Sequence, residues 1–349
     1  MAGRALRCAV VGLGRIGSIL EDDQLREKPC THAGAIAALP GCALVGGADT
    51  DAERRSLFAR RWNCSSLYAD AGLMLRDLAP DILCIATHPD SHLEYVRLAA
   101  DHGVRVAVCE KPLADTLAAA RKIAALHTTG KIKVLTNHER RYSADYVQAR
   151  SRVARERYGK LLSVTARLYF GRTRSLMSQL VHDGTHLVDI IAFLAGGYLE
   201  KPRVSGSLSA KAGTAFILAR VEGSGVPVVI ESGAERDHLS FEMDLSFSAG
   251  RIRIGNGLYE EYGSKKSPYY EGFRSLAAEA KTFAQTGYFL SMMKDAAACA
   301  RQPGRQPVSG AADGLAALRF ILSLAEAEGL PAPGARRNQP PEPSRKKTV

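Results

Sequence analysis

The chain has 349 residues, 46% of them hydrophobic and 24% charged, and its formal net charge is +11. This composition is that of an ordinary globular protein, and the length suggests two domains. No apolar run approaches the roughly 20 residues of a membrane span, and the basic residues lack interleaved aromatic side chains, so we expect neither a membrane nor a nucleic-acid partner.

A glycine-rich turn follows the first predicted strand. Leu6–Val11 is a short apolar run, and Gly12-Leu-Gly14-Arg15-Ile16-Gly17 comes directly after it. Such glycines permit a tight turn and a close approach of the backbone to a pyrophosphate, at the positive end of a helix. Because the turn follows an N-terminal strand, it predicts dinucleotide binding by these residues.

The next segment departs from a simple strand–helix–strand plan. Residues 21–32 are polar and contain Pro29, which predicts a loop or a broken helix. The helix is expected to resume at 32–39. The inserted loop either covers the cofactor and touches substrate or is a surface excursion, and both interpretations stay open.

The second predicted strand, 43–49, ends in Asp49. An acid at this position accepts hydrogen bonds from the adenosine ribose hydroxyls, which favours NAD over NADP. Arg54 and Arg55 follow closely, so NADP stays possible.

Helices and strands then alternate in the first half of the chain. Helices are predicted at 51–62, 68–78, 92–102 and 116–127, and strands at 81–86, 104–109 and 133–137. This alternation predicts a doubly wound parallel sheet, which forms a dinucleotide-binding Rossmann domain over residues 1–137.

The second half changes character. Short strands are predicted at 161–170, 205–208, 214–221, 226–232, 238–247 and 250–254, with helices at 143–157, 178–195, 275–286 and 310–328. We expect a second α/β domain over 138–330, built on a large open mixed or antiparallel sheet. The basic, proline-rich residues 331–349 are predicted to be disordered.

An ionisable pair closes the apolar run 106–109. Glu110 and Lys111 follow it directly, and Pro112 ends the strand because it cannot donate to a ladder. Ligands bind at this edge of open α/β sheets, so Lys111 is either an acid/base group or one half of a structural ion pair.

The predicted helix 178–195 carries a second polar group. His182, His186 and Asp189 recur at helical spacing and share one face. They form a catalytic face with His186 as the base, a metal site, or a pair of structural histidines. Because no third ligand is evident and Asp183 stands where a zinc protease carries glutamate, we predict no metal.

Taken together, the motifs resemble those of the Gfo/Idh/MocA oxidoreductases, from Leu6 to about Glu328. The matching stretches are Gly12–Gly17, 47–51, 86–92, 110–112, Asn137 with Arg140 and Arg141, and 184–189. The resemblance implies a Rossmann domain followed by an open-sheet domain, bound NAD or NADP, and a sugar or cyclitol substrate. It also implies a homo-dimer or homo-tetramer that assembles through the second sheet.

The resemblance also implies roles for individual residues. Lys111 matches the catalytic lysine of the family and His186 its catalytic histidine. Thr87, Glu110 and Asn137 match positions near the nicotinamide. The stretch 86–92 adds His88, Pro89 and His92 to the predicted cofactor contacts.

One position departs from the family. Members often carry an aspartate four residues before the histidine, where this chain has His182, with Asp183 one residue later. One residue turns a helical side chain by about 100°. Either His182 replaces the carboxylate, or Asp183 reaches the site through a local distortion of the helix.

We therefore predict an NAD(P)-dependent oxidoreductase that acts on a hydroxyl or keto group of a sugar, cyclitol or derivative, with anionic and nucleotide-linked compounds included. The alternatives are an NAD-dependent glycosidase with internal redox cycling and a non-catalytic NAD(P)-binding regulator. The seven scattered cysteines lack Cys-x-x-Cys spacing, which favours the reducing cytoplasm.

Overall fold

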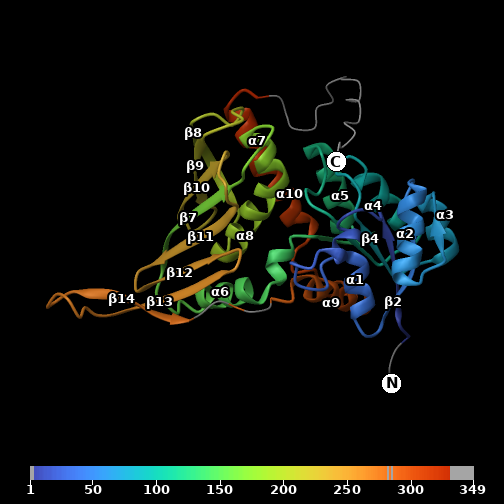
Figure 1. Ribbon diagram of the computed structural model, residues 1–349, viewed down its shortest axis with the longest axis horizontal. Coiled ribbons are helices and arrows are strands. Elements are labelled where there is room, and N and C mark those ends of the chain that lie inside the picture. The colour runs from blue at the N-terminus through green and yellow to red at the C-terminus, as the bar shows by residue number, and fades with distance from the viewer. Residues whose placement is uncertain (1–3, 281–282, 284–285, 331–349) are drawn as a thin grey trace.

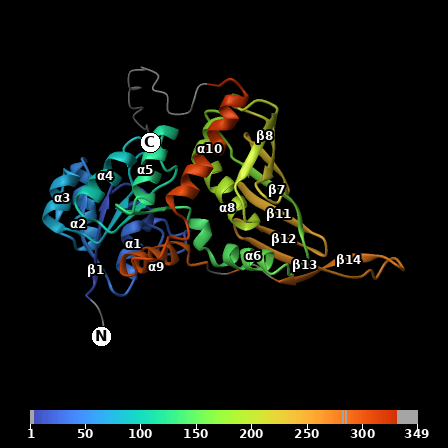
Figure 2. The same cartoon turned by 180° about the vertical axis from the view of Figure 1, so that it is seen from behind.

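A computed structural model describes residues 4–280, 283 and 286–330. Two sheets, each with its own helices, form two lobes that lie side by side (Figure 1 and, from behind, Figure 2). The predicted tail, 331–349, lies outside the described residues. Among the described helices, none is long and apolar enough to cross a membrane.

The first sheet has six parallel strands in the order β3-β2-β1-β4-β5-β6. The strands are β1 (Leu6–Val11), β2 (Cys42–Ala48), β3 (Leu67–Tyr68), β4 (Ile82–Ile85), β5 (Val106–Cys109) and β6 (Lys133–Thr136). The order reverses between β1 and β4, and ligands bind at such a switch point, beyond the carboxyl ends of the strands. The predicted doubly wound parallel sheet is confirmed.

Helices cover both faces of this sheet, which explains why its central strands are apolar throughout. One face packs against α1 (His32–Ala38) and α9 (Tyr288–Arg301), and α2 (Ala52–Trp62) adds Phe58 to the same core. The other face packs against α3 (Ala71–Leu78), α4 (His92–Asp101) and α5 (Leu117–Thr128).

The segment between the glycine turn and α1 contains no α-helix and is chiefly a loop, one of the two alternatives predicted for residues 21–32. It holds a short turn and the 3-10 helix η1 (Ile19–Asp22), and α1 then begins at His32, capped by Thr31. The Glu27 carboxylate accepts hydrogen bonds from the Thr286 N–H (2.8 Å), the Thr286 hydroxyl (3.1 Å) and the Gly287 N–H. This inserted segment is therefore fixed to the start of α9.

The second sheet has eight strands in the order β14-β13-β12-β11-β7-β10-β9-β8. They are β7 (Leu161–Tyr169), β8 (Leu199–Ser205), β9 (Thr214–Val221), β10 (Pro227–Gly233), β11 (Ser240–Phe247), β12 (Gly250–Gly255), β13 (Leu258–Lys266) and β14 (Arg274–Ala280). Only the β7–β10 pair among these is parallel, so the predicted large mixed sheet is confirmed.

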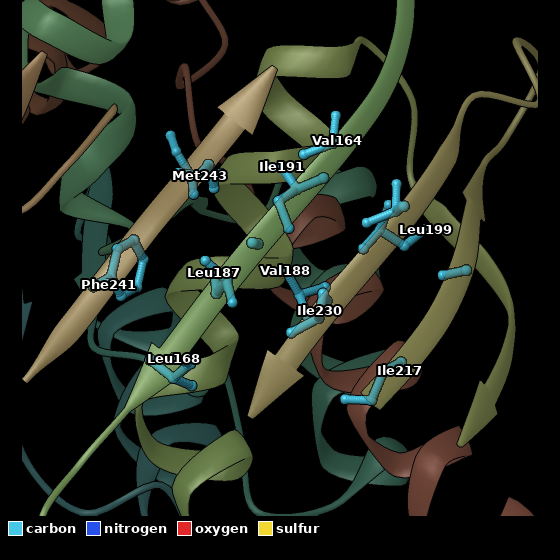
Figure 3. Close-up of a cluster of buried hydrophobic side chains, with 14 of the residues drawn as sticks. Val164, Leu168, Leu187, Val188, Ile191, Leu199, Ile217, Ile230, Phe241 and Met243 are labelled. Atoms are coloured by element: carbon cyan, nitrogen blue, oxygen red, sulfur yellow. The ribbon is translucent and has the colours of Figure 1, made fainter. Parts of the chain in front are cut away.

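One face of this sheet is buried under α8 (Thr185–Ala195) and α10 (Ala311–Ala327). Figure 3 shows Leu187, Val188 and Ile191 of α8 against residues of β7, β10 and β11. The opposite face is open, and Phe216 and Leu218 of β9 are exposed on it. Helix α10 also packs against α5 of the first lobe and so joins the lobes.

Three local predictions were wrong, and two elements were missed. Residues 275–286 were expected to be helical, but Arg274–Ala280 forms strand β14, because pairing with β13 overrides the helix propensity of its alanines. The strand expected at 205–208 lies at Leu199–Ser205. Tyr68 belongs to β3 rather than to a helix, and β13 and α9 were not predicted at all.

The predicted helix 178–195 has three parts. It begins with α7 (Leu176–Gln179), continues as the π-helical turn η3 (Leu180–Gly184) and ends as α8. A π-turn is a local widening that often marks a functional site. Before it in the chain lie the 3-10 helix η2 (Glu139–Tyr142) and α6 (Ala144–Ala154).

Candidate active site

A cleft of about 1170 Å³ lies between the two lobes, at the carboxyl ends of the first sheet. Most of the residues predicted for the site line it. From the first lobe they are Gly12, Gly14, Arg15, Ile16, Asp49, Thr87, His88, Pro89, Glu110 and Lys111, and from the second His182, Asp183 and His186. Gly17, His92 and Asn137 do not line the cleft.

The glycine turn has the shape that a pyrophosphate requires. Gly12 has a φ of +86°, and a Cβ there would lie 2.6 Å from the Ala86 carbonyl oxygen. A Cβ on Gly17 would collide with the Gly12 carbonyl oxygen. Gly14 meets only the Arg54 side chain, at 3.6 Å, so its backbone faces open space. Gly12 and Gly17 thus shape the turn, and Gly14 leaves the phosphate position accessible.

Asp49 lies beside this turn at the end of β2. Its carboxylate accepts hydrogen bonds from the Leu13 N–H (2.8 Å) and the Asp51 N–H (2.9 Å). Arg54 lies 3.7 Å from the carboxylate and lines the cleft. Arg55 instead donates to the backbone carbonyls of residues 49 and 50. The adenosine end of the cleft therefore offers one carboxylate and one arginine, the groups that suit a ribose or its 2′-phosphate.

His92 and Asn137 support the cleft from behind. The ring nitrogens of His92 lie 3.3 Å from the Leu113 carbonyl and 3.2 Å from the Thr87 carbonyl, and burial lowers the pKa of this histidine. Asn137 donates to Glu110 at 2.6 Å. Through these hydrogen bonds His92 positions Thr87 and Asn137 positions Glu110, and both Thr87 and Glu110 line the cleft.

Glu110 is the centre of a buried network. Its Oε1 accepts from His32 Nε2 (2.8 Å) and from Asn137, while its Oε2 accepts from the Lys111 N–H (3.3 Å). Burial alone would raise the pKa of Glu110, but the hydrogen bond from His32 and the positive charge there lower it. Burial would lower the pKa of His32, yet Cys84 and Glu110 raise it. A fully paired carboxylate therefore stands behind Lys111.

Lys111 reaches from the end of β5 across to the second lobe. Its Nζ donates to the His182 carbonyl oxygen at 2.7 Å. That carbonyl lies in the π-turn η3 and also accepts from the Thr185 hydroxyl at 3.3 Å. Lys111 thus sits in the cleft with one of its three donors bound and the others available to a ligand.

His186 lines the cleft from the first turn of α8. Among the described residues, its buried Nδ1 has no hydrogen-bond partner. Burial, together with the positive charges of Lys111 and Arg140, holds the pKa of His186 well below its ordinary value. The ring is therefore neutral at neutral pH, which is the form that accepts a proton.

Asp189 does not share the cleft with His186, although the two were predicted to lie on one helical face. It is buried and accepts from His138 (2.9 Å) and, in a two-point contact, from Arg141 (2.7 and 2.8 Å). Burial alone would raise the pKa of Asp189, but His138 and Arg141 lower it to about 2. The His138 ring meets the His186 ring edge-on, with centroids 6.2 Å apart.

Several residues that line the cleft were not predicted from the sequence, namely Arg26, Glu139, Asp145 and Tyr288, and Arg140 was given no role. The Arg140 guanidinium lies 3.6 Å from the centroid of the Phe241 ring and donates to Asn256 Oδ1 at 2.9 Å. The sequence signal for Arg140 was its place in the stretch of Asn137, Arg140 and Arg141 that resembles the family. Arg26 lies in the inserted segment, for which contact with cofactor and substrate was one of the two interpretations left open, whereas Tyr288 had no signal because it begins the unpredicted helix α9.

The described residues contain no group of three His, Cys, Asp or Glu side chains that could hold a metal ion. The cleft instead combines a phosphate turn, an ammonium and a neutral imidazole. This set can bind a dinucleotide and, beside it, move a proton at a carbinol oxygen.

Comparison with known proteins gives the following relatives. Residues 6–138 match the family described as "Oxidoreductase family, NAD-binding Rossmann fold". The D-apiose dehydrogenase of Paraburkholderia graminis is 32% identical over 175 residues, which are 47% of this chain and 46% of that protein. The inositol 2-dehydrogenase of Salmonella typhimurium is 28% identical over 198 residues, 54% of each chain. The chain thus spans about half the length of these curated relatives.

Solved structures extend the likeness to both lobes. A dehydrogenase of Chromobacterium violaceum superposes with a TM-score of 0.77 at 16% identity, over 94% of this chain and 96% of that one. At this level of identity the likeness shows the fold alone. The arrangement of a Rossmann lobe and an open-sheet lobe is therefore that of a solved dehydrogenase.

Proposed function

We propose that the chain is a dehydrogenase or reductase of the Gfo/Idh/MocA family, whose model matches residues 6–138, and that it acts on a CH–OH group of a sugar, cyclitol or related derivative. The observation that carries the proposal is the meeting of Lys111 and His186 in one cleft with the glycine turn. A binding-only protein has no need of a lysine and a neutral histidine at the nicotinamide end.

The two residues would divide the proton chemistry of one oxygen. His186, neutral at neutral pH, takes the proton from the substrate hydroxyl as the carbinol is oxidised. Lys111 donates a hydrogen bond to the same oxygen and stabilises the negative charge that develops on it. In the reverse direction His186 returns the proton.

The first lobe would hold the cofactor. When bound, NAD supplies the acceptor of the hydride. Gly12, Gly14 and Ile16 line the pyrophosphate position, Asp49 the ribose position, and Thr87 and Lys111 the nicotinamide end. Arg54 beside Asp49 is the group that would accommodate the phosphate of NADP.

The substrate end of the cleft is polar and carries both charge signs. Arg140 and Lys111 offer donors, while Asp145, Glu139 and Asp183 offer carboxylate oxygens. Such a set suits a compound with several hydroxyl groups, in line with D-apiose and inositol, the compounds named for two relatives. The open face of the second sheet, with its exposed Phe216 and Leu218, would form a homo-dimer or homo-tetramer contact.

The test is cofactor reduction with a panel of polyols. Purified protein with NAD or NADP is offered myo-inositol, D-apiose, D-glucose and D-glucuronate, and absorbance at the reduced-nicotinamide band is followed. We expect reduction with at least one polyol, and we expect Lys111→Ala to abolish it while NAD still binds by fluorescence titration.

Two results would contradict the proposal. Unchanged turnover in Lys111→Ala would remove the assigned role of Lys111. Binding of NAD without turnover of any polyol would favour a regulator, whereas release of 4-nitrophenol from an added 4-nitrophenyl glycoside with no net cofactor change would favour an NAD-dependent glycosidase.

A further inference from the structure

The carboxylates that line the cleft differ in how fully the protein satisfies them. Asp49 and Glu110 accept hydrogen bonds on both of their oxygens. Asp145 accepts two on one oxygen, from residues next to it in its own turn. Glu139 is half-buried and lines the same cleft, yet among the residues that the structure describes it accepts no hydrogen bond and forms no ion pair. Asp183 is likewise half-buried and without such a partner among the described residues, but it lies in the π-turn beside His186 and is already a candidate partner of that histidine. Glu139 is the half-buried carboxylate of the cleft that still lacks a role.

Glu139 lies close to the reacting groups. It opens η2, directly before Arg140, and the charges of Arg140, Glu110 and Lys111 all act on it. Burial raises the pKa of Glu139, and the charge of Arg140 offsets this only in part. Tyr288, whose pKa is raised by burial and by Glu139, lines the cleft on the other side. Glu139, Lys111 and Tyr288 thus line one cleft, and the charges of Lys111 and Glu139 are close enough to act on each other.

A half-buried carboxylate without a donor from the protein has lost part of its hydration without gaining a hydrogen bond in exchange, which costs free energy. A donor from the ligand would remove this cost. An ammonium group is a poor candidate, because Arg140, Lys111 and Arg26 already place three positive charges near Glu139. A hydroxyl group donates without adding charge, and its hydrogen bond to a carboxylate is short and strong.

We propose that Glu139 is a specificity-determining residue that accepts a hydrogen bond from a second substrate hydroxyl, on a carbon next to the one that is oxidised. The substrate class is then a vicinal diol, with one hydroxyl on Lys111 and His186 and its neighbour on Glu139. This inference rests on the proposed dehydrogenase function and adds which part of the substrate the cleft recognises.

The experiment compares Glu139→Gln and Glu139→Ala with the native protein on two substrates, the best polyol of the panel and its deoxy analogue that lacks one hydroxyl beside the oxidised carbon. With the polyol, we expect kcat/KM to fall roughly 10- to 100-fold in Glu139→Ala and less in Glu139→Gln, chiefly through KM. With the deoxy analogue that lacks the hydroxyl bound by Glu139, the native and variant proteins should have equal kcat/KM. Glu94→Gln, at an exposed site on α4 outside the cleft, is the control.

The pH dependence gives a second readout. The raised pKa of Glu139 means that KM of the native protein should rise as the pH falls toward mildly acidic values, and this rise should vanish in Glu139→Gln. Equal KM in native and variant proteins would overturn the inference, as would a loss that persists with every deoxy analogue in a protein of unchanged melting temperature. If the native protein turns over no polyol at all, the proposed function has failed and the inference falls with it.

Discussion

The two walls of the cleft, one around Lys111 in the first lobe and one around His186 in the second, differ in how far the protein pairs their key polar group. Behind Lys111, both oxygens of Glu110 accept hydrogen bonds from His32, Asn137 or a backbone N–H, so the carboxylate itself is fully paired, although His32 Nδ1 and Asn137 Oδ1 have no partner among the described residues. On the other wall, His186 keeps a buried Nδ1 without a partner among the described residues, and it follows a π-turn. Pairing fixes the first wall before any ligand arrives, whereas the second wall leaves groups for the ligand to satisfy.

The largest expected effect lies on the second wall. His186→Ala should lower kcat by about 10²- to 10⁴-fold, the usual contribution of a general base, with the melting temperature nearly unchanged. His102→Ala, an exposed histidine at the end of α4, is the control. In the native protein, kcat at saturating substrate should hold as the pH falls through the usual histidine range, because the pKa of His186 lies well below it. An acid limb near pH 6.5 would argue against His186 as the base.

On the first wall the larger effect should be on stability. His32→Leu removes one partner of the buried Glu110 and should cost about 3 kcal/mol of unfolding free energy. His32→Gln can still donate to the carboxylate and should recover part of this loss. Urea unfolding of the three proteins measures the difference. Equal midpoints for Leu and Gln would show that the pairing of Glu110 is not what stabilises this wall.

A third effect, of about 2 kcal/mol, should appear on acidification. The folded pKa of Asp189, about 2, lies below its ordinary value of 3.8. A lowered carboxyl pKa contributes stability that is present above the unfolded value and is lost as the pH falls toward the folded one. Unfolding free energies between pH 4 and pH 2 should therefore decline more steeply in the native protein than in Asp189→Asn. Parallel curves would contradict the pairing of Asp189 with His138 and Arg141.

The smallest effect should separate His182 from Asp183. Both line the cleft beside His186, and the π-turn supplies the local distortion that the sequence left as one of two possibilities. We expect Asp183→Asn to lower kcat by up to about tenfold. A carboxylate is a stronger hydrogen-bond acceptor than a neutral amide, and the loss of the charged acceptor is worth about 1.4 kcal/mol. His182→Asn should have little effect, because its carbonyl rather than its ring holds Lys111. The reverse ranking would make the His182 ring the partner.

Sequence reasoning reached those features that depend on short stretches of chain. The apolar run before Glu110 and the glycines after β1 each fix a local geometry, and the structure places both at the cleft. Helical periodicity alone wrongly joined Asp189 to His186, since it cannot foresee that Arg141 and His138 would bind that carboxylate. Strand β14 was not predicted because its helix-forming residues become a strand only by pairing with β13.

The hydrogen bond from Lys111 Nζ to the His182 carbonyl links the two lobes through the reacting residue itself. Any separation of the lobes would break this bond and leave the ammonium free to turn. We therefore expect the contact between the lobes and the positioning of the Lys111 ammonium to be gained or lost together. A lobe-opening perturbation far from the cleft, such as shortening α10, should therefore impair turnover before it weakens cofactor binding.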